Sequence, residues 1–231
     1  MHVPDGFLDV PTSVATGVVA VAGLGLALRG ARRELDDRTA PMAGLVATFV
    51  FATQMLNFPV GAGTSGHLLG GALAAVLVGP WTGLLCVSVV LIVQSLLFAD
   101  GGITALGTNI TLMGIVGVLV GWAVFRGLQI VLPKSLALVP PIAAVAALVS
   151  VPVASLAFVG LYAVGGTAPI PLESLATAML GWHTLIGIGE ALITGLVVGS
   201  VTAVRPDLVY GARRTLRARE LEIRVTQGAP G

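Results

Sequence analysis

Long apolar runs alternate with short polar stretches along nearly the whole chain. Their approximate limits are 12–28, 41–58, 67–78, 81–98, 110–125, 136–164 and 181–204. A helix that crosses a membrane needs about 20 predominantly apolar residues, and fewer where protein surrounds it. The pattern therefore predicts an all-α fold, a polytopic transmembrane helical bundle of six to seven membrane segments. The run at 67–78 is the shortest, and we expect it to be a partial span.

The composition agrees with a chain that lies in a membrane. Hydrophobic residues make up 56% and charged residues 10% of the chain. A soluble domain carries about 25% charged residues. The 31 glycines suit helices that pack closely through small residues. The single cysteine, Cys86, lies within an apolar run, so the sequence predicts neither a disulfide framework nor a thiolate metal cluster.

The positive charges predict the orientation of the bundle. If all seven segments cross, the stretches 29–38, 79–80 and 126–134 share one side with the residues after 204. All 12 Lys and Arg residues fall on that side. Because cytoplasmic loops are enriched in Lys and Arg, the N-terminus is expected outside and the C-terminus in the cytoplasm. We expect a transmembrane bundle with an outer N-terminal loop at 1–204 and a basic cytoplasmic tail at 205–231.

The tail has two possible environments. Its arginines are interleaved with the apolar residues Leu216, Leu221 and Ile223. Such a segment either lies on the inner leaflet, in contact with membrane lipid, or forms a solvated helix.

The first two residues offer a set of metal donors. Met1 and His2 bring an α-amine, a peptide nitrogen and an imidazole into one short stretch. Ordinary pKa values of about 8 for the amine and about 6.5 for imidazole let both act as donors at modest proton cost. The alternative is a solvated chain end with no ligand role. In the predicted topology His2, His67 and His183 all lie on the outer side, and such nitrogen donors suit a first-row transition metal.

Acidic residues fall on the same side. The outer loops hold Asp5, Asp9, Asp100 and Glu173, and no basic residue neutralises them. An opening with this charge attracts cations.

Four long stretches resemble signature sequences of one family. They are MHVPDGFLD at the start, QMLNFPVGAGTSGHLLGG at 54–71, QSLLFADGGITALGTNITLMG at 94–114 and WHTLIGIGEALITG at 182–195. They look like the CbiM/NikM family, the substrate-specific membrane components of prokaryotic energy-coupling-factor transporters for cobalt and nickel. The resemblance runs from residue 1 to about residue 200 and implies a multi-pass protein of the cell membrane.

The resemblance also implies a metal site and a substrate. Its ligands would be the Met1 amine, the backbone nitrogen and imidazole of His2, and His67. Four nitrogens in a plane suit Ni(II), and low-spin Co(II) also adopts that geometry. Ni²⁺ or Co²⁺ would be the transported substrate, with no bound organic cofactor. Residues that could hold the ligands in place are Gln54, Asn57, Ser65, Asn109, His183 and Glu190.

The chain lacks the residues of an ATPase. A P-loop requires Gly-Lys-Ser/Thr to hold phosphates, whereas the only lysine, Lys134, follows Pro133. The resemblance implies that energy comes from partners: a transmembrane coupling subunit, two cytoplasmic ATPase subunits and, in many members, a small auxiliary membrane protein. No nucleic acid partner is expected.

Two other functions are open to the residues. Glu190 is the one acid inside a membrane run, so it is either the relay of a secondary metal-cation transporter or a structural carboxyl bound to Gln94, Asn57 or Asn109. Gly63-Thr64-Ser65-Gly66 matches a motif of rhomboid-type intramembrane proteases, in which Ser65 and His183 would be nucleophile and base. The protease hypothesis leaves the N-terminal motif unexplained. We therefore predict a transport subunit rather than an enzyme.

Overall fold

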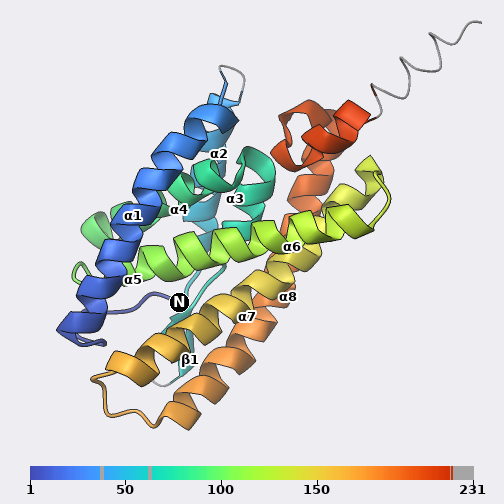
Figure 1. The fold of residues 1–231 in the computed structure, drawn as a ribbon. Helices are drawn as coiled ribbons and strands as arrows, with labels where there is room; N and C mark the ends of the chain where they lie inside the picture. The colour runs from blue at the N-terminus through green and yellow to red at the C-terminus, as the bar shows by residue number, and fades with distance from the viewer. Residues whose placement is uncertain (37–38, 62–63, 219, 221–231) are drawn as a thin grey trace, which may run out of the picture.

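The structure, a computed structural model, describes residues 1–36, 39–61, 64–218 and 220 and is a bundle of helices (Figure 1). Five helices are long and apolar enough to cross a membrane. They are α1 (Val10–Glu34), α4 (Pro80–Leu97), the helix Leu106–Val131, the helix Leu136–Gly165 and α8 (Leu172–Val204). A sixth, α2 (Ala40–Gln54), is apolar but shorter. The prediction of an all-α membrane bundle is thus confirmed for five to six candidate crossings.

Two of the long helices are built from several segments. The third consists of α5 (Leu106–Asn109), the π-helix η1 (Ile110–Val116) and α6 (Gly117–Val131). The fourth consists of the short 3₁₀ turn η2 (Leu136–Leu138) followed by α7 (Val139–Gly165). A π-helical turn inside an α-helix frequently marks a functional site. Here it begins directly after Asn109, a residue that binds the N-terminal segment.

The last helix begins earlier than the apolar run predicted. We expected it to start near residue 181, but α8 begins at Leu172. Glu173 and Thr177 interrupt the apolar run, yet they lie on the exposed side of the first turns, whereas Leu175 and Met179 are buried. His183 therefore lies about three turns inside a helix rather than at its outer start.

The structure also differs in detail from the apolar run predicted at 67–78. Only Gly71–Val78 is helical, and all eight residues of this helix, α3, are buried. The preceding residues form a two-stranded antiparallel hairpin of β1 (Phe58–Gly61) and β2 (Thr64–Gly66), which the sequence had indicated only as a loop. A helix that is apolar on every face is surrounded either by protein or by lipid, and protein surrounds α3. Gly121 allows α6 to pack closely against α3, because a Cβ at this position would lie only 2.7 Å from the Cβ of Ala72.

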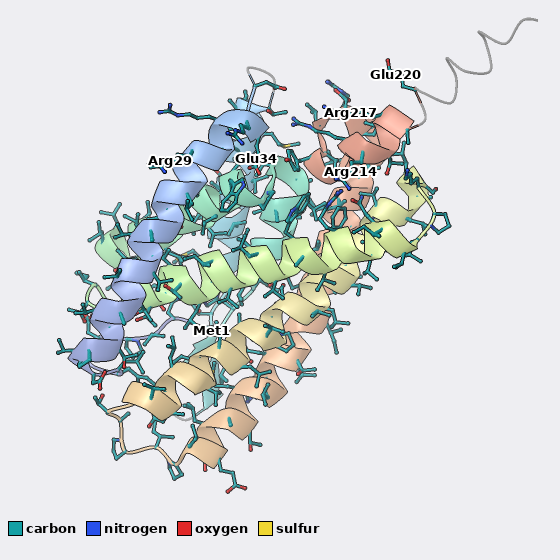
Figure 2. All side chains as sticks on the ribbon, in the orientation of Figure 1. Met1, Arg29, Glu34, Arg214, Arg217 and Glu220 are labelled. Atoms are coloured by element: carbon teal, nitrogen blue, oxygen red, sulfur yellow. The ribbon has the colours of Figure 1, made fainter. Side chains whose placement is uncertain are left out.

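The predicted basic stretches meet at one end of the bundle. The Glu34 carboxylate, at the end of α1, accepts hydrogen bonds from the backbone nitrogens of Trp81 (3.2 Å) and Thr82 (2.7 Å). It thereby caps the start of α4. Arg213 donates to the carbonyl oxygen of Glu34. Figure 2 shows Glu34, Arg29, Arg214 and Arg217 at this end and Met1 in the middle of the bundle.

Two short 3₁₀ turns, η3 (Pro206–Leu208) and η4 (Tyr210–Ala212), connect α8 to the C-terminal segment. Gln129 of α6 donates to the carbonyl oxygen of Gly211, which ties this segment to the end of α6. The same end of the bundle thus collects the ends of α1 and α6 and the residues that follow α8. The remaining basic residues of the predicted cluster, Arg38, Arg219 and Arg224, lie outside the described residues.

Glu34→Ala should destabilise the bundle by about 1–3 kcal/mol, because it leaves the buried N–H groups at the start of α4 without an acceptor. Thermal unfolding of the purified protein in detergent measures the effect. Glu173→Ala, which removes an exposed carboxyl from the first turn of α8, serves as the control and should change little. Equal melting temperatures for the two variants would show that Glu34 does not cap α4.

Candidate metal centre

The first three residues lie inside the bundle. Met1, His2 and Val3 are buried, with 2%, 7% and 1% of their surfaces exposed. The N-terminus is placed among α5, α6, α7 and β1 (Figure 1). The alternative of a solvated chain end is therefore wrong for these residues, although Pro4, Asp5 and Gly6 are exposed.

Hydrogen bonds from neighbouring loops hold the segment in place. The Asn109 side chain binds both backbone groups of Val3: its Oδ1 accepts from the nitrogen (2.7 Å) and its Nδ2 donates to the oxygen (3.1 Å). The Val3 oxygen also accepts from the backbone nitrogen of Gly102 at 3.0 Å. Asp5 accepts from the backbone nitrogen and the hydroxyl of Thr104. The buried backbone groups of Val3 are thus paired as they would be in a strand.

His2 lies between two polar side chains. Its Nε2 is 3.2 Å from Oε1 of Gln94, and its Nδ1 is 3.1 Å from Oδ1 of Asp100. The backbone passes the ring closely at Gly101, which has a φ of +89° and would place a Cβ 3.0 Å from Cδ2 of His2. Only glycine combines that backbone conformation with that contact.

The hairpin brings His67 against His2. The two rings stack with their centroids 4.4 Å apart and their planes 29° from parallel. Nδ1 of His67 lies 2.8 Å from the carbonyl oxygen of Leu68, so Nδ1 carries the proton and Nε2 carries the lone pair. This Nε2 is buried and has no hydrogen-bond partner among the described residues. A buried acceptor without a donor is costly unless something else binds it, and a metal ion is the natural occupant.

Two side chains from the bundle fix the loop that carries His67. Gln54 donates to the carbonyl oxygen of Leu69 at 2.7 Å. The Glu190 carboxylate accepts from the backbone nitrogens of Leu69 (2.6 Å) and Gly70 (3.0 Å). Glu190 is therefore a carboxyl that holds backbone donors, and both of its oxygens are engaged.

The predicted partners of Glu190 are engaged elsewhere. Gln94 contacts His2, Asn109 binds Val3, and Asn57 donates to Oδ2 of Asp100 at 2.8 Å. The proposal of a Gln94, Asn57 or Asn109 partner for Glu190 was wrong. The apolar pattern did not reveal that the carboxyl faces the backbone of a loop more than a hundred residues away in the sequence.

His183 lies within electrostatic range of the Met1 amine and of His67. Nδ1 of His183 lies 2.8 Å from the carbonyl oxygen of Met179, one turn earlier in α8. Its Nε2 is buried and has no hydrogen-bond partner in the described part of the chain. The side chain of Ser65 lies outside the described residues.

The outer acids do not form a carboxylate site. Oδ1 of Asp5 binds Thr104, and Oδ1 of Asp9 caps α1 by accepting from the backbone nitrogen of Thr12. Glu173 is exposed on α8. Within the described ranges, no group of three or more His, Cys, Asp or Glu side chains is placed to hold a metal.

Burial changes the protonation of the nitrogens. Desolvation lowers the pKa of the Met1 amine to about 4, although the charges of Asp100 and Glu190 oppose the shift. Desolvation likewise lowers the pKa of His2 and takes that of His67 well below its usual range. Burial alone would raise the pKa of Asp100, but its contact with His2 prevails and the pKa falls. At neutral pH the centre therefore presents neutral nitrogen donors beside one ionised carboxylate.

These groups match the chemistry of a planar nitrogen site. The Met1 amine and the His2 peptide nitrogen close a five-membered chelate ring with a metal, and the peptide nitrogen and Nδ1 of His2 close a six-membered one. His67 Nε2 would be the fourth donor. With the metal on Nδ1, the Nε2–H of His2 would donate to Gln94, the kind of contact that orients ligating imidazoles. A divalent ion bound to a deprotonated peptide nitrogen keeps one positive charge, which Asp100 would balance.

Comparisons with known proteins agree with this chemistry. Residues 2–208 match the family model for CbiM, described as "Cobalt uptake substrate-specific transmembrane region". The chain belongs to the CbiM family. It is therefore a multi-pass membrane protein of cobalt and nickel transport, with prokaryotic relatives. The predictions of the family and of a transport protein rather than an enzyme are confirmed, and the rhomboid-type protease hypothesis is set aside.

Individual relatives extend over most of the chain. A putative metal transport protein of Haloquadratum walsbyi is 39% identical over 91% of this chain and 94% of its own length. A putative fused nickel transport protein NikMN of Archaeoglobus fulgidus is 38% identical over 90% of this chain and 68% of its own length. The crystal structure of a transition metal transporter superposes with a TM-score of 0.80 at 31% identity, covering 88% of this chain and 93% of that one.

Glu190→Gln should loosen the loop at 67–70, because one of the two backbone N–H groups loses its acceptor. Amide hydrogen exchange in a peptide that covers the loop should accelerate by about tenfold to a hundredfold. Thr194→Val is the matched control, since this buried hydroxyl lies one turn further along α8 and has no partner among the described residues. Unchanged exchange, together with lost metal uptake, would point instead to a relay role for Glu190.

Proposed function

We propose that the protein binds Ni²⁺ or Co²⁺ at an extracytoplasmic site and delivers the ion across the membrane as the substrate-specific subunit of an energy-coupling-factor transporter. The observation that carries the proposal is the unpartnered Nε2 of His67, which is buried against His2 beside the buried chain start. The ligands are the Met1 amine, the peptide and imidazole nitrogens of His2, and His67. Gln54, Glu190 and Asn109 hold these ligands in place.

The arrangement of charge supports the proposed orientation. The basic residues gather at the end of the bundle where Arg213 reaches Glu34, and this end is the cytoplasmic one by the positive-inside rule. The exposed loops that hold the chain start then face outside. Metal would enter past Asp100, whose side chain is 19% exposed and lies against His2.

The proposed partners follow from family membership and from the missing ATPase motif. They are a transmembrane coupling subunit, two cytoplasmic ATPase subunits and a small auxiliary membrane protein. Secondary transport through Glu190 is less favoured, because both of its carboxylate oxygens already accept hydrogen bonds from the Leu69 and Gly70 backbone.

Extending the chain by one glycine before Met1 should abolish high-affinity binding. The α-amine would become a peptide nitrogen, and the added residue has no room beside a buried Met1. Isothermal titration with Ni²⁺ compares the native start with the extended start, and a protein extended by one glycine at the C-terminus is the control. If the two starts bind equally well, the Met1 amine is not a ligand.

His67→Ala should remove Ni²⁺ binding, because the fourth nitrogen donor is lost. His183→Ala should weaken it by at most about 10–100-fold, the range seen when a supporting residue is changed. Both substitutions delete one buried imidazole, so each serves as the structural control for the other in thermal unfolding without metal. Comparable losses of affinity would mean that the ligand assignment is wrong.

The affinity for Ni²⁺ should rise by about tenfold per pH unit between pH 7 and 8. Burial lowers the pKa of the Met1 amine to about 4 and lowers those of His2 and His67 from their ordinary value, so these groups are mostly deprotonated in that range. Only the His2 peptide N–H then releases a proton on binding. Titrations at several pH values test this. A flat profile would indicate carboxylate ligands, and a slope of two or three would mean that the amine and imidazoles titrate as in a free peptide.

A further inference from the structure

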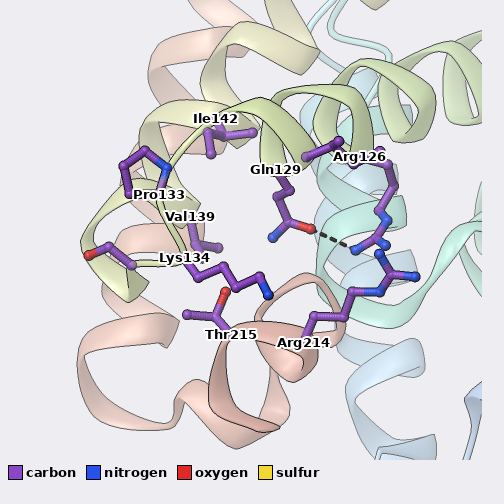
Figure 3. A pocket seen from close by; sticks show the side chains of 10 residues that line it. Arg126, Gln129, Pro133, Lys134, Val139, Ile142, Arg214 and Thr215 are labelled. Atoms are coloured by element: carbon purple, nitrogen blue, oxygen red, sulfur yellow. Dashed lines mark hydrogen bonds between the residues drawn. The ribbon is translucent and has the colours of Figure 1, made fainter. Parts of the chain in front are cut away.

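Two adjoining pockets lie at the basic end of the bundle, far from the proposed metal centre. The first, of about 230 Å³, is formed by the end of α6, the start of α7 and the C-terminal segment (Figure 3). Arg126, Lys134 and Arg214 provide its charges. The second, of about 380 Å³, is lined by five arginines and two aromatic rings. Arg126 and Arg214 line both pockets.

The lining of the pockets concentrates positive charge. No acidic side chain in the described part of the chain lines either pocket. Arg126 lies 5.5 Å from the centre of the Trp122 ring and donates to Oε1 of Gln129 at 2.8 Å. Arg213 lies 4.8 Å from the centre of the Tyr210 ring and 3.8 Å from the carboxylate of Asp36. Fixed guanidinium groups with no anion between them are a prepared site for a phosphate.

The first pocket also has a hydroxyl group and an apolar edge. Thr215 lies in it beside Lys134, as Figure 3 shows, whereas both ends of the Gln129 amide are engaged by Arg126 and Gly211. Ile130, which lines the pocket, and Val131 are 75% and 74% exposed. In a chain that lies in a membrane, such side chains at the end of an apolar helix face acyl chains. The ligand that fits has an anionic head and an apolar tail.

We propose that these pockets bind the phosphate headgroup of an anionic phospholipid of the inner leaflet. Arg126 and Arg214 contact the phosphate from the wall that the two pockets share. Lys134 approaches from the outer edge, and the acyl chains run along Ile130 and Val131. The lipid would connect α6 to the C-terminal segment. The hydrogen bond from Gln129 of α6 to the carbonyl oxygen of Gly211 already connects the same two parts. Basic pockets at the cytoplasmic ends of membrane helices recognise lipid headgroups in this way.

Native mass spectrometry of the purified full chain tests the proposal with phosphatidylglycerol and phosphatidylcholine that carry the same acyl chains. The wild type should retain phosphatidylglycerol in preference to phosphatidylcholine. The double substitution R126Q/R214Q should weaken phosphatidylglycerol binding by about thirtyfold, and K134Q by about fivefold. The control R29Q/R32Q removes the same charge from exposed positions on α1 that line neither pocket, and it should stay within about twofold.

Thermal unfolding shows whether each variant is folded. Because Lys134 is exposed, K134Q should fold normally, so its lipid binding tests the proposal even if the double variant does not fold. Equal retention of the two lipids by the wild type, or equal losses in both double variants, would overturn the proposal. If glycerol phosphate or inorganic phosphate binds as tightly as phosphatidylglycerol, the site takes a soluble anion and the lipid is wrong. Binding of an acidic peptide with no lipid preference would assign the pockets to a protein partner, against the proposal.

Discussion

Burial of the chain's first residues is the constraint on which the surrounding part of the bundle depends. A charged ammonium inside a helical bundle is costly, and burial lowers the pKa of the Met1 amine so that it stays neutral. The backbone of the segment needs partners that regular structure cannot supply, and Asn109 and Gly102 provide them at Val3. Gly101 leaves room for the His2 ring. A neutral terminal amine is a good metal donor, so the condition that makes burial tolerable also makes the site chemically useful.

The short buried stretch between the hairpin and α4 is held by one carboxylate at each end. Glu190 accepts from the backbone nitrogens of Leu69 and Gly70, just before α3 begins. Glu34 accepts from those of Trp81 and Thr82 at the start of α4. In both places carboxyl oxygens meet the unpaired N–H groups that precede or open a helix. The eight-residue α3, too short to hold itself in place, is thereby fixed relative to α1 and α8, and His67 with it.

Much of the fold could be predicted from hydrophobic periodicity, and the family from four long motifs. Periodicity missed the start of α8, because polar residues on an exposed helix face look like a loop when read linearly. It missed the β1–β2 hairpin, because its two strands are short and rich in glycine. The family resemblance of the sequence indicated Met1, His2 and His67 as ligands, and in the structure the His67 ring stacks on that of His2. The contacts of Gln94 and Asp100 with His2 were not foreseen, since pairings across about a hundred residues leave no local signal.

The central claim is that the metal is held by nitrogen atoms of the chain start and of His67, with no carboxylate ligand. X-ray absorption at the nickel K-edge, on protein loaded with Ni²⁺ and with a native N-terminus, tests it most directly. The account predicts a four-coordinate planar spectrum with nitrogen donors only, of which two arise from imidazole. A six-coordinate spectrum dominated by oxygen donors would contradict the account.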